Sequence, residues 1–97
     1  MQETHLLLAN KNLSYLELAK KMLTYHDDNY AVDVAITGDE CLEKIMRNNY
    51  DLVLLDYEID DDKGLEILNK IVRSGFELPV IMMIEEGRED ITFKTRY

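Results

Sequence analysis

The sequence is poor in the residues that cross-link or interrupt a chain. It has one cysteine, one proline, four glycines and no tryptophan among 97 residues. The single cysteine, Cys41, excludes a disulfide within the chain and fits a reducing compartment. Because 46% of the residues are hydrophobic and 32% are charged, the composition indicates one ordered globular domain rather than a disordered chain.

Basic residues and long apolar runs are also scarce. Eleven Lys and Arg stand against twenty Asp and Glu, so the net charge is 11 − 20 = −9. This surface repels a phosphate backbone and therefore argues against direct nucleic-acid binding, whereas it suits partner proteins with basic patches. No apolar run approaches the roughly 18 residues of a membrane span, and the first residues lack the features of a signal peptide. We therefore expect a cytoplasmic protein that does not contact a membrane.

Four apolar runs have the character of strands, at residues 5–9, 30–36, 51–56 and 79–84. Continuous runs of Leu, Val and Ile are typical of parallel strands that are covered on both faces. The second run alternates in part and is expected at an edge of the sheet. Pro79 fits because proline is tolerated at the first residue of a strand.

Helical patterns separate these runs. Ser14 and Glu17 have the spacing of a capping box, and so do Thr37 and Glu40. A third helix is predicted by an apolar stripe formed by Leu65, Leu68, Ile71 and Val72, with Gly75 beyond its end. The charged segment after residue 84 is expected to begin a fourth helix. The order βαβαβαβ with right-handed crossovers predicts an α/β fold with a doubly wound parallel sheet.

Sheets of this class place their sites at the carboxyl ends of the strands. Asn10 and Lys11 follow the first strand, Asp56 ends the third, and Ile84 and Glu85 end the fourth. We therefore expect these side chains to lie at one edge of the sheet, with Asp56 as the chemical group of most interest. The alternative interpretation, without a chemical role, is that Asp56 is a solvated carboxylate or a helix cap.

The pattern around Asp56 resembles the receiver domain of two-component response regulators, over essentially the whole chain. D-L-V-L-L-D is similar to the family's acceptor strand, and Gly64 follows Asp56 by eight residues, as in the family's loop. L-P-V-I-M-M is similar to the fourth strand, and T-G-D-E-C-L-E to the start of the second helix. The resemblance implies a flavodoxin-like signalling domain, not an enzyme, in which Asp56 accepts a phosphoryl group from a histidine kinase or another signalling protein.

Several positions depart from the family's pattern. The resemblance implies an acidic pair that helps to hold Mg²⁺, but Asn10 and Lys11 stand there, and an ammonium cannot be a metal ligand. Ile84 replaces a hydroxyl residue and Glu85 a small one. No metal cofactor is therefore expected, or at most weak Mg²⁺ binding at Asp56.

Two further residues, Glu58 and Asp60, belong to the expected pocket or its loop, and Lys11 has an additional expected role. Glu58 is expected to line the pocket, and Asp60 stands where the family usually has proline. Lys11 is expected to pair with Asp56 and to replace part of the metal's charge. The acidic run at residues 60–62 lacks the ligand spacing of an EF-hand and is interpreted as a solvated loop.

Two functions stay open within this resemblance: a receiver phosphorylated weakly at Asp56, and a degenerate receiver that binds partners independently of phosphorylation. An unrelated flavodoxin-like enzyme or nucleotide-binding protein is disfavoured, because the chain has no glycine-rich phosphate loop. Cys41 is interpreted as a small core residue rather than a nucleophile.

The resemblance also implies that residues 1–97 form a single receiver domain that is incomplete at its C-terminus, without its fifth strand and helix. The strand at 79–84 then leaves an apolar edge open to another chain. If residues 1–97 are the whole folded chain, we expect a homodimer, or association through this edge or the adjoining helix surface.

Overall fold

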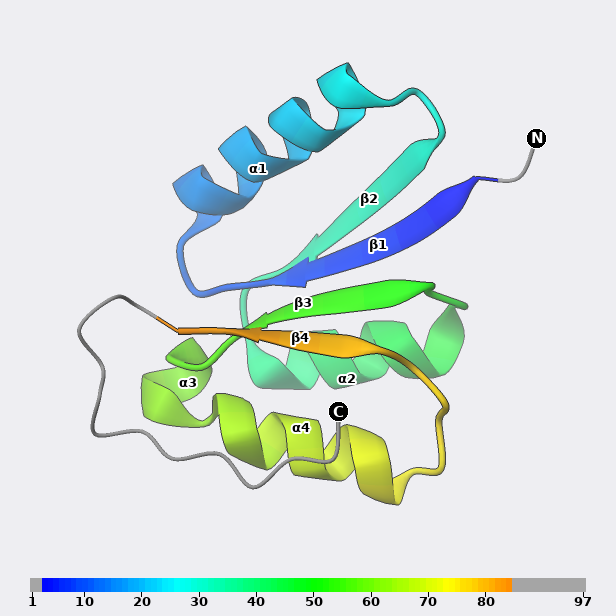
Figure 1. Ribbon diagram of the computed structural model, residues 1–97. Coiled ribbons are helices and arrows are strands. Elements are labelled where there is room, and N and C mark those ends of the chain that lie inside the picture. Colours follow the sequence, from blue (N-terminus) through cyan, green and yellow to red (C-terminus); the bar gives the residue numbers. More distant parts are fainter. Residues whose placement is uncertain (1–2, 85–97) are drawn as a thin grey trace.

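The computed structural model describes residues 3–84, which form four strands and four helical segments (Figure 1). In chain order they are β1 (Thr4–Ala9), α1 (Leu13–His26), β2 (Tyr30–Ala35), α2 (Gly38–Arg47), β3 (Leu52–Asp56), α3 (Ile59–Asp62), α4 (Gly64–Arg73) and β4 (Val80–Met83). Glu85 and the expected fourth helix lie outside the described residues. No helix within them is long and apolar enough to span a membrane.

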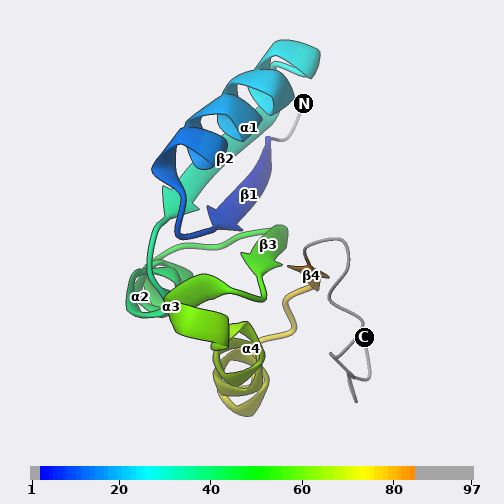
Figure 2. The ribbon, with the colours of Figure 1, turned by 90° about the vertical axis from the view of Figure 1, so that its left-hand side faces the viewer.

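The four strands form one parallel sheet in the order β2-β1-β3-β4. Helix α1 lies on one side of the sheet and α2 and α4 on the other, as Figures 1 and 2 show. The prediction of a doubly wound α/β fold is confirmed, and so is the edge position of the second strand. In this order β1 and β3 are the central strands, and their carboxyl ends are neighbours.

The core consists of two layers because β1 buries side chains on both of its faces. Leu6 and Leu8 pack with Leu16 of α1, whereas Leu7 and Ala9 join the cluster beneath α2 and α4. This explains why the first apolar run does not alternate with polar residues: each face of a central parallel strand is covered by a helix.

Helix α1 begins two residues earlier than the capping box at Ser14 predicted. The N-cap is Asn12, whose side-chain oxygen accepts a hydrogen bond from the backbone N–H of Tyr15 at 3.1 Å. The prediction of Ser14 as the cap is wrong, because asparagine caps a helix at least as well as serine and lies where the chain leaves the extended conformation.

The second predicted cap is confirmed. The hydroxyl oxygen of Thr37 accepts a hydrogen bond from the N–H of Glu40 at 3.0 Å, and the Glu40 carboxylate accepts one from the N–H of Ile36 at 2.7 Å. Both side chains therefore satisfy backbone donors at the start of α2, as in a capping box displaced by one residue.

Candidate functional site

Asp56 lies half-buried at the carboxyl end of the central strand β3. The register pairs Asp56 with Met83 of β4 and Leu55 with Ala9 of β1. The residues that follow those neighbouring strands, Asn10 and Ile84, therefore lie at the same edge of the sheet. The structure therefore places Asn10, Asp56 and Ile84 at one edge of the sheet, as expected, and Glu85 lies outside the described residues.

The surroundings of Asp56 disfavour its charged form. Burial raises the pKa of the Asp56 carboxyl above the ordinary value, and the negative charges of Glu58 and Asp62 raise it as well. The backbone N–H of Glu58, which donates a hydrogen bond to the carboxylate, and the positive charge of Lys11 act in the opposite direction. The net result is a carboxyl with a raised pKa among acidic neighbours.

Lys11 forms its ion pair with Glu58, not with Asp56. The Nζ of Lys11 lies 3.7 Å from Oε2 of Glu58, and the Glu58 side chain is only 19% exposed. The expectation of a direct pair between Lys11 and Asp56 is wrong, because Glu58 competes for the same ammonium. Lys11 therefore influences Asp56 through its charge at a longer range.

Asn10 has a structural role at this edge. Its side-chain oxygen accepts a hydrogen bond from the N–H of Asn12 at 2.9 Å, and its own N–H donates to the carbonyl of Ala35 at 3.0 Å. These contacts fix the turn between β1 and α1. The turn presents Lys11 next to Glu58 and adds no carboxylate to the pocket.

The donor set fits a tight magnesium site poorly. Mg²⁺ prefers an octahedral cage of oxygen atoms that includes one or two carboxylates. Asp56 offers one carboxylate, but that of Glu58 is paired with the Lys11 ammonium. Within residues 3–84 no three His, Cys, Asp or Glu side chains are arranged to hold a metal ion.

Gly64 allows the acceptor loop to close against the end of β3. A Cβ at this position would lie 2.6 Å from the carbonyl oxygen of Asp56 and 2.6 Å from Cα of Tyr57. The N–H of Gly64 donates to the carbonyl of Tyr57 at 2.9 Å. The eight-residue spacing from Asp56 to Gly64 thus reflects a close backbone contact that only glycine permits.

Between Asp56 and Gly64 the chain forms a short left-handed turn that the sequence pattern did not predict. Asp60, Asp61 and Asp62 have φ values of 52°, 60° and 66°. Asp60 is also bound to α2, because its Oδ2 accepts a hydrogen bond from the N–H of Gly38 at 2.8 Å. The interpretation of this run as a solvated loop is therefore wrong for Asp60, while Asp61 and Asp62 are exposed. Aspartate tolerates the left-handed region better than most residues, which was the available signal.

The left-handed turn leads to a prediction at Asp61. Asp61→Gly should be more stable than Asp61→Ala by about 1 kcal/mol, because a Cβ is unfavourable at φ 60° and ψ 63°. Urea denaturation of both variants measures the difference. The control pair is Glu66→Gly and Glu66→Ala on the exposed surface of α4, where alanine should be the more stable by about 1 kcal/mol. If the alanine variant were more stable than the glycine variant at both positions, the left-handed conformation of Asp61 would be contradicted.

Cys41 does not belong to the site. Its side chain is fully buried, and burial, followed by the charge of Glu40, raises the pKa of the thiol from 9.0 to about 12. A thiol in this state is a poor nucleophile at neutral pH. The prediction of Cys41 as a core residue is confirmed.

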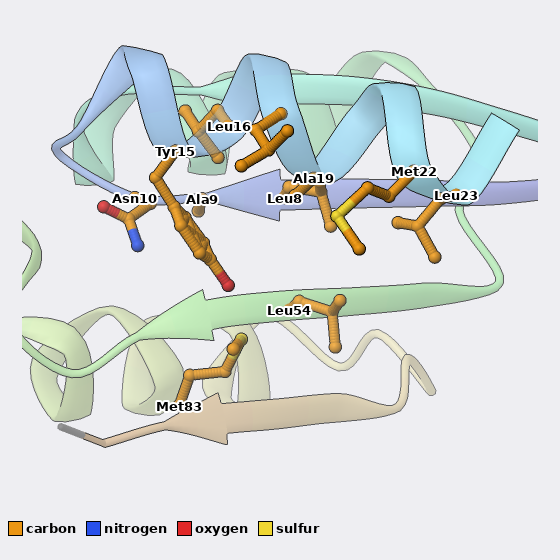
Figure 3. Close-up of a pocket in the computed structure, with 11 residues that line it drawn as sticks. Leu8, Ala9, Asn10, Tyr15, Leu16, Ala19, Met22, Leu23, Leu54 and Met83 are labelled. Carbon is orange, nitrogen blue, oxygen red and sulfur yellow. The ribbon is translucent and has the colours of Figure 1, made fainter. Parts of the chain in front are cut away.

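An apolar groove of about 330 Å³ lies beneath α1, and Asn10 at the carboxyl end of β1 lines part of it (Figure 3). Tyr15 and Met22 of α1 border it on one side, and Leu54 of β3 and Met83 of β4 on the other. Among its lining residues only Tyr15 carries an ionisable group. The groove is therefore not a place for acid–base or metal chemistry.

A doubly wound sheet with a half-buried aspartate at the end of a central strand defines a receiver-like architecture. The family model for the response regulator receiver domain matches residues 6–95. The chain is 37% identical over 83 residues to the transcriptional regulatory protein DltR of Streptococcus agalactiae, covering 86% of this chain and 36% of DltR. It is 34% identical over 87 residues to the transcriptional regulatory protein ResD of Bacillus subtilis, covering 90% of this chain and 35% of ResD. The chain belongs to the response regulator receiver domains and spans about a third of these curated relatives.

Solved structures agree with this assignment. A CheY-like receiver domain protein from Methanospirillum hungatei has a TM-score of 0.80 at 25% identity, covering 92% of this chain and 70% of that one. The response regulator TrrA from Thermotoga maritima, solved in complex with Mg²⁺ and BeF, has a TM-score of 0.78 at 29% identity, covering 88% and 72%. The fold and the family prediction are therefore confirmed: this is a signalling domain homologous to two-component response regulators.

Proposed function

We propose that the domain receives a phosphoryl group at Asp56 from a histidine kinase in a two-component phosphorelay. The observation that carries this proposal is the position of Asp56, at the carboxyl end of central strand β3 and half-buried at the edge where β1 and β4 also end. A carboxylate oxygen would attack the phosphorus while the bond from phosphorus to the donor atom breaks. The product is an acyl phosphate on Asp56.

Phosphoryl transfer depends mainly on positioning and on neutralising negative charge. The Glu58 backbone N–H donates a hydrogen bond that favours the charged form of the Asp56 carboxylate. Lys11 supplies the nearby positive charge, but Glu58 neutralises part of it. Because Glu58 and Asp62 add negative charge around Asp56, we infer that phosphorylation is weak. Mg²⁺ binding to this pocket is inferred to be weak as well.

A second function is favoured by the Lys11–Glu58 ion pair and by Ile84. Lys11 pairs with Glu58 beside Asp56, and Ile84 offers no hydroxyl to a phosphoryl group. In this alternative the domain binds a signalling partner independently of phosphorylation. Its fold then serves to present a surface, and Asp56 has no acceptor role.

Intact mass after incubation with acetyl phosphate decides between these functions. We expect a minor fraction of the protein to gain one phosphoryl group, and we expect Asp56→Asn to gain none. Asp28→Asn, which changes an exposed aspartate away from the pocket, is the matched control and should behave as wild type. An equal adduct on Asp56→Asn, or no adduct on wild type with or without Mg²⁺, would favour the phosphorylation-independent function.

We further propose that residues 1–97 form one cytoplasmic receiver domain that associates as a homodimer through β4. Within residues 3–84, β4 pairs with β3 and no strand pairs with its other edge, and Ile81 is 51% exposed. An open apolar edge is a template for pairing with another chain. Light scattering should show a concentration-dependent dimer that Ile81→Lys abolishes. A monomer at all concentrations would refute the dimer.

A further inference from the structure

The left-handed turn connects the pocket to the start of α2. Asp60 points its carboxylate to α2 and accepts the Gly38 N–H at 2.8 Å. Asp62, two residues further on, is exposed, and its charge makes the smallest of the contributions that raise the pKa of the Asp56 carboxyl. Gly64, at the end of the same turn, packs against the backbone of Asp56. One short turn of the backbone therefore carries both the contact with α2 and a charge that opposes Asp56.

The turn is held in an unfavourable conformation by fixed ends. Three successive residues with positive φ are disfavoured for L-amino acids, since the Cβ atom crowds the backbone. Ile59 before them is completely buried, and the N–H of Lys63 donates to the Ile59 carbonyl at 2.9 Å. Gly64 packs against the end of β3. Between these two anchors, the hydrogen bond from the Gly38 N–H to Asp60 connects the turn to the start of α2.

The start of α2 depends on the same hydrogen bond. Thr37 satisfies the N–H of Glu40, while Asp60 satisfies the N–H of Gly38. A Cβ on Gly38 would lie 2.5 Å from Cδ1 of Ile67 and 2.6 Å from Oδ2 of Asp60, so α2 begins in close contact with the turn and with α4. A change in the turn must therefore reach the first residues of α2.

We propose that the Asp60–Gly38 hydrogen bond couples the negative charge at Asp56 to the conformation of the start of α2. Additional negative charge at Asp56 repels Asp62, the turn leaves its left-handed conformation, and Asp60 releases the Gly38 N–H. The trigger rests on the proposed function, because a phosphoryl group raises the charge at Asp56 from about −1 to about −2. The coupling itself is a property of the turn and exists without phosphorylation.

A double-mutant cycle tests the coupling without any phosphoryl donor. The readout is the hydrogen-exchange rate of the Gly38 amide, measured by NMR. Asp56→Asn and Asp62→Asn should each slow this exchange about threefold, and the double variant should slow it by much less than the product, because both remove the same repulsion. Asp60→Ala should speed the exchange about tenfold and abolish the effect of Asp56→Asn. Asp61→Asn is the matched control and should leave the rate unchanged.

A second measurement adds acetyl phosphate and follows adduct mass and Gly38 exchange in one sample. In phosphorylated molecules the exchange should rise about tenfold, and in Asp60→Ala it should not rise further. An adduct with unchanged Gly38 exchange overturns the coupling and leaves the receiver function intact. If no adduct forms, the proposed phosphorylation of Asp56 fails. The mutant cycle still tests the coupling, because multiplicative effects of Asp56→Asn and Asp62→Asn on the Gly38 exchange rate would overturn it.

Discussion

Gly64→Ala is expected to lower the free energy of unfolding by about 3 kcal/mol, as measured by urea denaturation. In an open helix position alanine would instead stabilise by about 1 kcal/mol. At Gly64 the new Cβ would meet the backbone of Asp56 and Tyr57 at 2.6 Å, and backbone atoms cannot rotate away as a side chain does. The same displacement moves Asp56, so the phosphoryl adduct should fall with stability.

Gly75→Ala separates crowding from backbone conformation. Gly75 has φ 80°, and no atom lies within 4 Å of the position of an added Cβ. Its replacement should cost only about 1–2 kcal/mol, from the left-handed conformation alone. If Gly64→Ala were no more destabilising than Gly75→Ala, close contact between the acceptor loop and β3 would not be the reason for glycine at position 64.

Lys11→Asp is expected to increase the Mg²⁺ affinity of the pocket on the order of tenfold or more. The change removes an ammonium that pairs with Glu58 at 3.7 Å and adds a carboxylate at the same edge of the sheet. Glu58 loses its ion pair with Lys11, and the carboxylate introduced at position 11 is a second carboxylate beside Asp56. An NMR titration that follows the amides around Asp56 measures the affinity.

Lys11→Met provides the control for this variant. It removes the positive charge but adds no oxygen ligand, so it should raise the Mg²⁺ affinity less than Lys11→Asp does. Tight, saturable Mg²⁺ binding by the wild type, equal to that of Lys11→Asp, would show that Lys11 does not restrict the pocket.

Much of the fold is readable from local patterns. The four apolar runs became the four strands of the sheet within one or two residues at each end. Parallel strands need long crossovers, and central strands need apolar residues on both faces, so run length and spacing predict the sheet. The convergence of Asn10, Asp56 and Ile84 at one edge followed from this order alone.

Local patterns were a poorer guide to the contacts of charged and capping side chains. Ser14 and Asn12 are both good caps, and only the path of the chain after β1 selected Asn12. Lys11 had two carboxylates within reach, and the structure pairs it with Glu58. A sequence states which charges exist, whereas their pairing depends on distances of a few ångströms.

The sequence by itself determined the alternation of strands and helices, the family, and the aspartate at the carboxyl end of β3. Only the tertiary structure decided that Asp60 binds the start of α2 and that Gly64 must touch the backbone of Asp56. Hydrophobic periodicity repeats along the chain and so can be read locally. A hydrogen bond between residues 38 and 60 depends on how two crossovers pack against one sheet, which no local stretch of sequence specifies.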